Sequence, residues 1–151
     1  MPKPDLPMAG GCRCGATRFE ITAPPMMTMA CHCTGCQKMA SSAYSLSMMV
    51  AGDAFRVTKG DTVQGGLKGP QIDHRFCPEC MSWMYTQFSD TDAYVNVRPT
   101  MLDDPSWFAP YVESWTSEKL PWVTLPVEQS YPQFPPKEDR PKLGEGFAAW
   151  F

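Results

Sequence analysis

The sequence has little charge and no excess of basic residues. Of its 151 residues, 19 % are charged, and 13 basic against 16 acidic residues give a formal net charge of −3. Soluble domains carry about 25 % charged residues, and proteins that bind nucleic acid normally carry a basic surface. We therefore expect no nucleic-acid partner. The apolar fraction of 43 % is enough for the core of one domain.

Long apolar runs are also missing. No segment approaches the roughly 18–20 consecutive apolar residues of a membrane span, so we expect no association with a membrane. The N-terminal segment 1–7 is rich in proline and lacks the apolar stretch of a signal peptide. Together these absences predict a cytoplasmic protein.

Proline is abundant instead, with 16 residues, roughly twice the average share of about 5 %. A helix-dominated fold is disfavoured, because proline breaks helix interiors. Short apolar segments between turn-forming residues predict a mainly β fold with one or two short helical turns. We expect a domain over 1–134 and a proline-rich tail, 135–151, that packs on this domain or on a partner subunit of a homo-oligomer. The expected strands are residues 15–21, 44–50, 54–58, 72–76, 83–87, 93–97, 111–116 and 122–124.

All seven cysteines fall into three short clusters. An odd number does not suit a disulfide framework, whereas ligand spacings of this kind are typical of zinc sites. Two pairs and one triplet divide most simply into one site of four ligands and one of three. The alternative is that some of these cysteines are inert core residues. The resulting groups are the four-cysteine site (Cys12, Cys14, Cys77, Cys80) and the three-cysteine site (Cys31, Cys33, Cys36).

The two sites predict different roles for two Zn²⁺ ions per chain. Four thiolates close a structural site, whereas three ligands with an open position are typical of a catalytic one. Thr34 and Gln37 match a capping box, which places Cys36 in the first turn of a short helix, where the helix dipole favours a thiolate. Cysteines two apart along a strand, as in segments 12–14 and 31–33, would face the same ion.

The cysteine motifs resemble those of the glutathione-dependent formaldehyde-activating (GFA, or CENP-V/GFA) family. The similar segments are 11–15 (Gly-Cys-Arg-Cys-Gly), 31–38 (Cys-His-Cys-Thr-Gly-Cys-Gln-Lys), 75–80 (Arg-Phe-Cys-Pro-Glu-Cys), 102–105, 108–110 and 117–122. This resemblance implies an Mss4-like fold of short antiparallel strands organised around zinc sites. It also implies a carbon–sulfur lyase-type enzyme that adds glutathione to formaldehyde, with a structural zinc at the four-cysteine site and a catalytic zinc at Cys31, Cys33 and Cys36.

Four positions depart from the family pattern. The family often has glycine where Met81 stands, a basic residue at Gln37, a small glycine-rich segment at 39–42 and histidine at Glu113. We expect these positions to lie near the open zinc position, so that they alter the substrate more than the metal. The expected partners are a small glutathione-like thiol and an aldehyde such as formaldehyde.

A zinc ion with three thiolate ligands favours a soft fourth ligand. We expect a substrate thiol to bind there as a thiolate and to attack an aldehyde carbon; the reverse step would release the aldehyde. In the alternative mechanism, the aldehyde oxygen binds the zinc and a free thiol attacks. Two other classes remain as alternatives. One is a non-catalytic, zinc-stabilised binding module. The other is a methionine sulfoxide reductase, which is disfavoured because it needs a spare redox cysteine that this chain lacks.

Five further polar residues are candidates for the same site. His32 lies between two cysteines and, on a strand, would point away from the metal, which favours a structural or exposed role; His74 is interpreted as a plain strand position. Arg75 and Arg98 have the charge to bind a carboxylate, but an isolated arginine is more often on the solvated surface. Glu113 is interpreted as a strand-edge charge rather than a general base.

Overall fold

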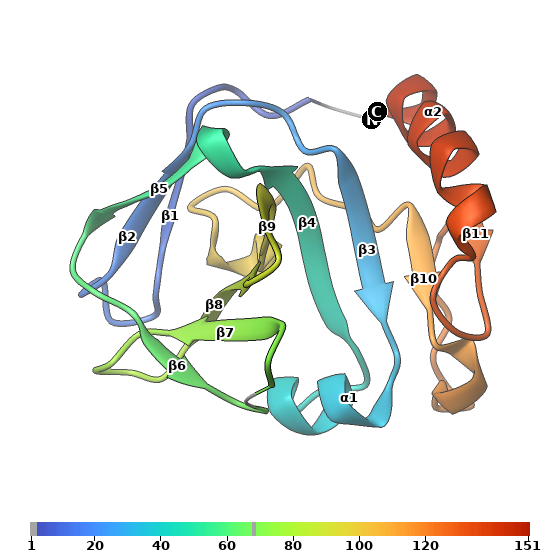
Figure 1. The fold of residues 1–151 in the computed structure, drawn as a ribbon, viewed down its shortest axis with the longest axis horizontal. Helices are drawn as coiled ribbons and strands as arrows, with labels where there is room; N and C mark the ends of the chain where they lie inside the picture. The colour runs from blue at the N-terminus through green and yellow to red at the C-terminus, as the bar shows by residue number, and fades with distance from the viewer. Residues whose placement is uncertain (1–2, 68) are drawn as a thin grey trace.

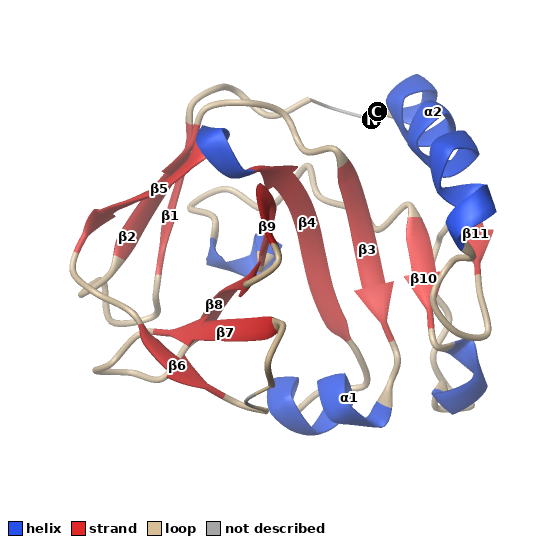
Figure 2. Ribbon diagram, viewed as in Figure 1, coloured by secondary structure: helices blue, strands red, loops and turns tan. Residues whose placement is uncertain are grey.

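The computed structural model describes residues 3–67 and 69–151 and confirms a mainly β fold with two α-helices (Figures 1 and 2). The strands are β1 (Met8–Gly11), β2 (Arg18–Ile21), β3 (Met27–Cys31), β4 (Ser45–Ala51), β5 (Phe55–Lys59), β6 (Val63–Gly65), β7 (Ile72–Phe76), β8 (Trp83–Phe88), β9 (Thr91–Val97), β10 (Val112–Ser114) and β11 (Gln129–Ser130). The helices are α1 (Thr34–Ala40) and α2 (Arg140–Trp150), and the 3₁₀ turns are η1 (Gly52–Ala54), η2 (Pro99–Met101), η3 (Thr116–Glu118) and η4 (Lys137–Asp139).

The strands form two sheets. Strands β1, β2 and β5 make a three-stranded antiparallel sheet, and the larger sheet has eight strands in the order β11-β10-β3-β4-β9-β8-β7-β6. The larger sheet is mixed, because β10 runs parallel to both β3 and β11 while the other pairs are antiparallel. Through these pairings, segments more than 80 residues apart in the sequence meet at the C-terminal end of β3.

The main core lies between the two sheets. On β2, buried Phe19 and Ile21 alternate with the half-buried Arg18 and Glu20, as expected of a strand with one face in the core. These two side chains pack in one cluster with buried residues of the larger sheet, including Met48, Val50, Met84, Val95 and Val97. The short strands therefore owe their stability to burial of their inner faces.

Several predicted elements differ from the structure. Strands β1, β3, β6 and β11 are absent from the expected strands, and segment 122–124, predicted as a strand, contains only a turn. Cys12 and Cys14 lie in a turn after β1 rather than on a strand. Strands β1 and β6 contain glycine, which has a low β propensity, and this obscures them in the sequence.

The C-terminal segment forms helix α2, which packs beside β10 and β11 (Figure 1). Leu143 and Phe147, four residues apart and so on one helix face, join Met27, Tyr111 and Val112 in a second cluster. At Gly146 a Cβ atom would lie 2.4 Å from the Tyr111 hydroxyl, so any larger residue would require the Tyr111 side chain to move. Among the residues that the structure describes, no helix has the length and apolar character to cross a membrane.

Candidate metal centres

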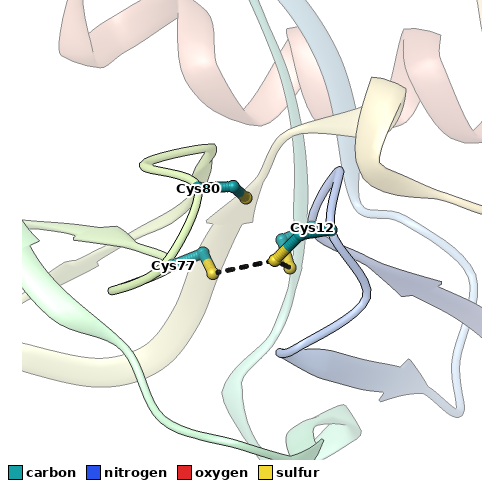
Figure 3. A group of neighbouring side chains, drawn as sticks. Cys12, Cys77 and Cys80 are labelled. Carbon is teal, nitrogen blue, oxygen red and sulfur yellow. Dashed lines mark hydrogen bonds between the residues drawn. The ribbon is translucent and has the colours of Figure 1, made fainter.

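The four-cysteine site joins two loops that are far apart in sequence. Cys12 and Cys14 follow β1, whereas Cys77 and Cys80 lie between β7 and β8 and face the first loop (Figure 3). All four sulfur atoms lie within 4.8 Å of one another, with 3.5 Å between the Sγ atoms of Cys12 and Cys14 and 3.8 Å between those of Cys14 and Cys77. Tetrahedral zinc with Zn–S bonds of about 2.3 Å needs sulfur atoms about 3.8 Å apart. The arrangement fits zinc.

Backbone hydrogen bonds shape both loops around this site. The Thr17 N–H donates to the Cys12 Sγ at 3.3 Å, and the Met81 N–H donates to the Cys77 carbonyl at 3.0 Å, which closes the Cys-Pro-Glu-Cys knuckle. Met81 has a φ of +57°, in the left-handed region that favours glycine. The glycine that the family often carries at this position is thus explained by backbone geometry, and Met81 adopts the same conformation at a steric cost.

The three-cysteine site lies where β3 passes into α1. Cys31 is the last residue of β3, Cys33 is the N-cap of α1, and Cys36 lies in its first turn; their ligand atoms also lie within 4.8 Å of one another. The Cys33 Sγ accepts the Cys36 N–H at 3.3 Å. The predicted N-cap at Thr34 is therefore wrong: a thiol takes the capping position, and the Thr34 N–H donates instead to the Glu118 carboxylate.

The thiols of this site have unequal acidities without a metal ion. A hydrogen bond from Cys31 lowers the pKa of Cys36 to about 5, opposed by burial, which raises it, and helped by the Ser45 hydroxyl and the positive charge of Arg98. The same pairing raises the pKa of Cys31. Zinc uptake must consequently displace protons, because zinc binds thiolates.

A buried network of charged and polar groups fixes the segment between Cys31 and Cys33. His32 is fully buried, and its Nε2 lies 2.8 Å from the Glu113 carboxylate on the neighbouring strand β10. Glu113 also accepts hydrogen bonds from Lys119 Nζ, at 2.8 and 3.1 Å, and from Ser130 Oγ at 2.8 Å. The interpretation of Glu113 as a strand-edge charge is wrong, because β11 covers the outer edge of β10. The ring of His32 contacts Glu113 and Tyr44 and is not part of the three-cysteine group, in agreement with the expected structural role.

Gln37 belongs to the same supporting structure. Its Nε2 donates to the His32 carbonyl at 2.7 Å and to the Glu118 carbonyl at 3.0 Å, which ties the end of β3 to turn η3. Gln37 directly follows Cys36, and its side chain is used in these contacts; its influence on the substrate stays a prediction.

The other candidate residues belong to the larger sheet: His74 and Arg75 lie on β7, and Arg98 directly follows β9. His74 on β7 bonds through Nδ1 to the Thr86 hydroxyl at 2.8 Å. Arg75 donates to the Thr62 hydroxyl at 3.0 Å and pairs with Asp73. Arg98, expected on the surface, is instead buried, with 7 % of its area exposed.

A cavity of about 440 Å³ lies beside the three-cysteine site. It is lined by Arg98 and by Met39 and Met81, which stand at positions that depart from the family pattern.

Comparison with known proteins supports the resemblance noted from the motifs. A family model described as glutathione-dependent formaldehyde-activating enzyme matches residues 7–118, which include both cysteine sites. A crystal structure of a Rhodobacter sphaeroides protein is similar, with a TM-score of 0.52 and 20 % identity over 64 % of this chain and 88 % of that one; at this identity the likeness concerns the fold alone. A search of curated proteins gives no match.

Proposed function

The chain belongs to the family of glutathione-dependent formaldehyde-activating enzymes, and from this premise we propose that it catalyses the addition of a small thiol to an aldehyde, or the reverse, at the three-cysteine site. The observation that carries the proposal is the ligand set. Three sulfur atoms converge within 4.8 Å, and the described part of the chain brings no fourth metal-binding side chain to them. A zinc ion there would keep one position for a reactant.

The reaction needs no redox partner. A carbon–sulfur bond forms between the thiol sulfur and the carbonyl carbon, the carbonyl π electrons move to oxygen, and that oxygen gains the proton that the thiol loses. Cys31, Cys33 and Cys36 would hold the zinc ion, which when bound supplies a soft, positively charged position that favours the thiolate form of a thiol.

The surrounding residues would keep this site rigid. The contact between His32 and Glu113 fixes the residue between two of the ligands, and the Gln37 amide donates to the backbone carbonyl of the same residue. Such outer contacts orient metal ligands and commonly change metal affinity by about 10–100-fold when removed. The four-cysteine site would act as a structural centre, because its four ligands leave no position for a reactant.

Cobalt-substituted protein offers a direct test, because the ligand-field bands of Co²⁺ respond to a change in the fourth ligand. We would titrate the full chain with glutathione, 2-mercaptoethanol and 3-mercaptopropionate, and then measure hemithioacetal formation from each thiol with formaldehyde and butanal. The matched variant is Cys36→Ser, which breaks the three-cysteine site and leaves the other site intact. We expect spectral changes and a rate above the spontaneous reaction in the wild type only.

Two outcomes would overturn the proposal. Unchanged spectra with every thiol, together with rates equal to the spontaneous reaction, would favour a zinc-stabilised binding module. Equal rates for the wild type and Cys36→Ser would place any activity elsewhere on the chain.

A further inference from the structure

The cavity beside the three-cysteine site has mainly apolar walls. Helix α1 contributes Met39, the start of β4 contributes Ser45 and Leu46, and the far side is formed by Met81, Trp83 and Met101. Ser45 connects the cavity to the three-cysteine site, because it pairs with Cys31 across the strands and its hydroxyl interacts with the Cys36 thiol. A reactant bound at the open metal position would therefore extend into a space that favours apolar groups.

Arg98 is the one charged residue among the described residues that line this cavity. Its guanidinium lies over the Trp83 ring, 3.7 Å from the ring centroid. Its hydrogen bonds go to neutral acceptors: the Leu46 carbonyl at 3.0 Å, the Ser47 hydroxyl at 2.6 Å and the Thr86 hydroxyl at 2.9 Å. None of the ion pairs found within residues 3–67 and 69–151 involves Arg98.

A buried cation without a carboxylate partner is unfavourable unless another anion compensates it. Burial lowers the pKa of Arg98 to about 10, so the group stays protonated at neutral pH. The thiolates of the three-cysteine site supply part of the compensation, since Cys36 and Cys31 act on Arg98 through their charges. With zinc bound, three thiolates and one Zn²⁺ together carry only one negative charge, so the compensation from this site is partial.

Two donors in this stacked pair also lack acceptors. Both the Arg98 Nε and the Trp83 Nε1 are buried, and neither has a hydrogen-bond partner within the described residues. Both residues line the cavity. These two N–H groups are closed off from solvent, so a carboxylate in the cavity would act on Arg98 chiefly through the charge of the guanidinium, and interactions with a charged group are the stronger ones.

We infer that this cavity binds an apolar reactant with a single carboxylate, which Arg98 holds while the reacting group lies at the three-cysteine site. This substrate class rests on the proposed function and deepens it. Glutathione fits the cavity less well, because its α-ammonium would find no acidic side chain among the described lining residues. The carboxylate belongs to the thiol or to the aldehyde, and the two sources are separable by experiment.

The first experiment needs no turnover. Calorimetry on the full-length, zinc-loaded protein compares phenylacetate with the neutral, similarly shaped phenylacetamide. Arg98→Met and Arg98→Lys test the guanidinium, and Arg56→Gln is the control, because it removes a charge from an exposed arginine on β5 that pairs with Glu20. We expect phenylacetate to bind roughly tenfold or more tightly than the amide. Arg98→Met should abolish this preference, Arg98→Lys should keep a part of it, and Arg56→Gln should leave it unchanged.

Equal binding of acid and amide to the wild type would overturn the inference, whether or not Arg98→Met folds. So would an acid preference that survives in a folded Arg98→Met protein, since Arg98 would then only balance the charge of the metal site.

The second experiment separates the two carboxylate sources and the two proposals. Values of kcat/KM are compared for 3-mercaptopropionate against its amide with formaldehyde, and for 4-oxobutanoate against butanal with 2-mercaptoethanol. We expect a preference for the acid in one of the two pairs, and the pair that shows it identifies the reactant that carries the carboxylate. Acid-selective binding without any turnover would support the carboxylate site and refute the proposed reaction. Turnover without acid preference in binding or rate would support the reaction and refute the carboxylate site.

Discussion

Replacement of Glu113 by glutamine is the sharpest test of how the sheet supports the three-cysteine site. Gln has the same shape but no charge, and it offers one acceptor oxygen in place of two. In the native protein the two carboxylate oxygens accept from His32, Lys119 and Ser130 at distances of 2.8–3.1 Å. In Glu113→Gln the new amide N–H groups must therefore face at least one of these donors.

The expected loss of stability follows from burial and from the charge of the partners. Breaking a buried ion pair by removing one partner costs roughly 3–5 kcal/mol. Lys119 keeps 21 % of its side-chain area exposed and can turn toward water, so we expect the lower end, about 3 kcal/mol. For a chain of this length that corresponds to a fall in Tm of about 6–12 °C.

The loss should depend on pH. Burial alone would raise the pKa of the Glu113 carboxyl, but hydrogen bonds from Lys119, Ser130 and His32 outweigh it and lower the pKa below its ordinary value of 4.5. A lowered pKa in the folded state stabilises the fold above the ordinary pKa, and this contribution disappears as the pH falls through the lowered value. The advantage of the wild type over Glu113→Gln should thus be full at pH 6–7 and shrink below about pH 4.5.

Urea unfolding of zinc-loaded protein at several pH values measures this difference. Since both proteins are compared at the same pH, the acid sensitivity of the zinc sites largely cancels. Glu20→Gln is the control: it removes a carboxylate that pairs with the 70 % exposed Arg56, and surface pairs contribute only about 0–1 kcal/mol. A Glu113→Gln protein within 1 kcal/mol of the wild type at pH 7, or a difference that grows in acid, would refute the reasoning.

Four other outcomes are expected. Cys80→Ala should give insoluble or molten protein, because structural zinc contributes roughly 10 kcal/mol or more; a sharp thermal transition near that of the wild type would contradict this. Stepwise chelation should remove about one zinc ion from the three-cysteine site while the far-UV signal survives; joint loss of both ions with unfolding would oppose distinct roles. Met81→Gly should raise the unfolding free energy by roughly 0.5–1 kcal/mol, because relief of the left-handed strain exceeds the added chain entropy; a less stable variant would show that packing of Met81 matters more. Phe147→Ala should cost roughly 3–5 kcal/mol in urea unfolding; a loss below 1 kcal/mol would mean that helix α2 contributes little to the folded state.

The grouping of the cysteines could be predicted because metal-ligand spacing is a local property of the sequence. Segments 12–14 and 77–80 each present two thiols to one point, and a zinc site needs four ligands to close. The sequence therefore indicated that these two loops meet, although strands β2 to β7 lie between them. The mainly β class followed from proline content and short apolar segments, which are also local signals.

Local signals were misleading where another residue competes for the same role. Thr34 is a better N-cap than cysteine by propensity, yet the Cys33 Sγ accepts the backbone N–H of Cys36 because the ligand geometry already places it there. Helix α2 was missed since its two glycines and one proline obscure the helical pattern, although Leu143 and Phe147, four residues apart, were a usable signal.

The surroundings of Glu113 and Arg98 depend on strand pairing, which no local pattern gives. Glu113 is buried because β10 lies between β3 and β11, and Arg98 is buried because it follows β9 next to β4 and stacks on Trp83 from β8. In both cases a charge expected in solvent is enclosed by segments far away in sequence. Charges enclosed in this way are costly unless they are compensated. Glu113 has charged and polar partners within the chain, whereas Arg98 donates to neutral acceptors and lies near a metal site that carries one net negative charge with zinc bound. This difference favours a structural role for Glu113 and supports the inference that Arg98 binds an anion.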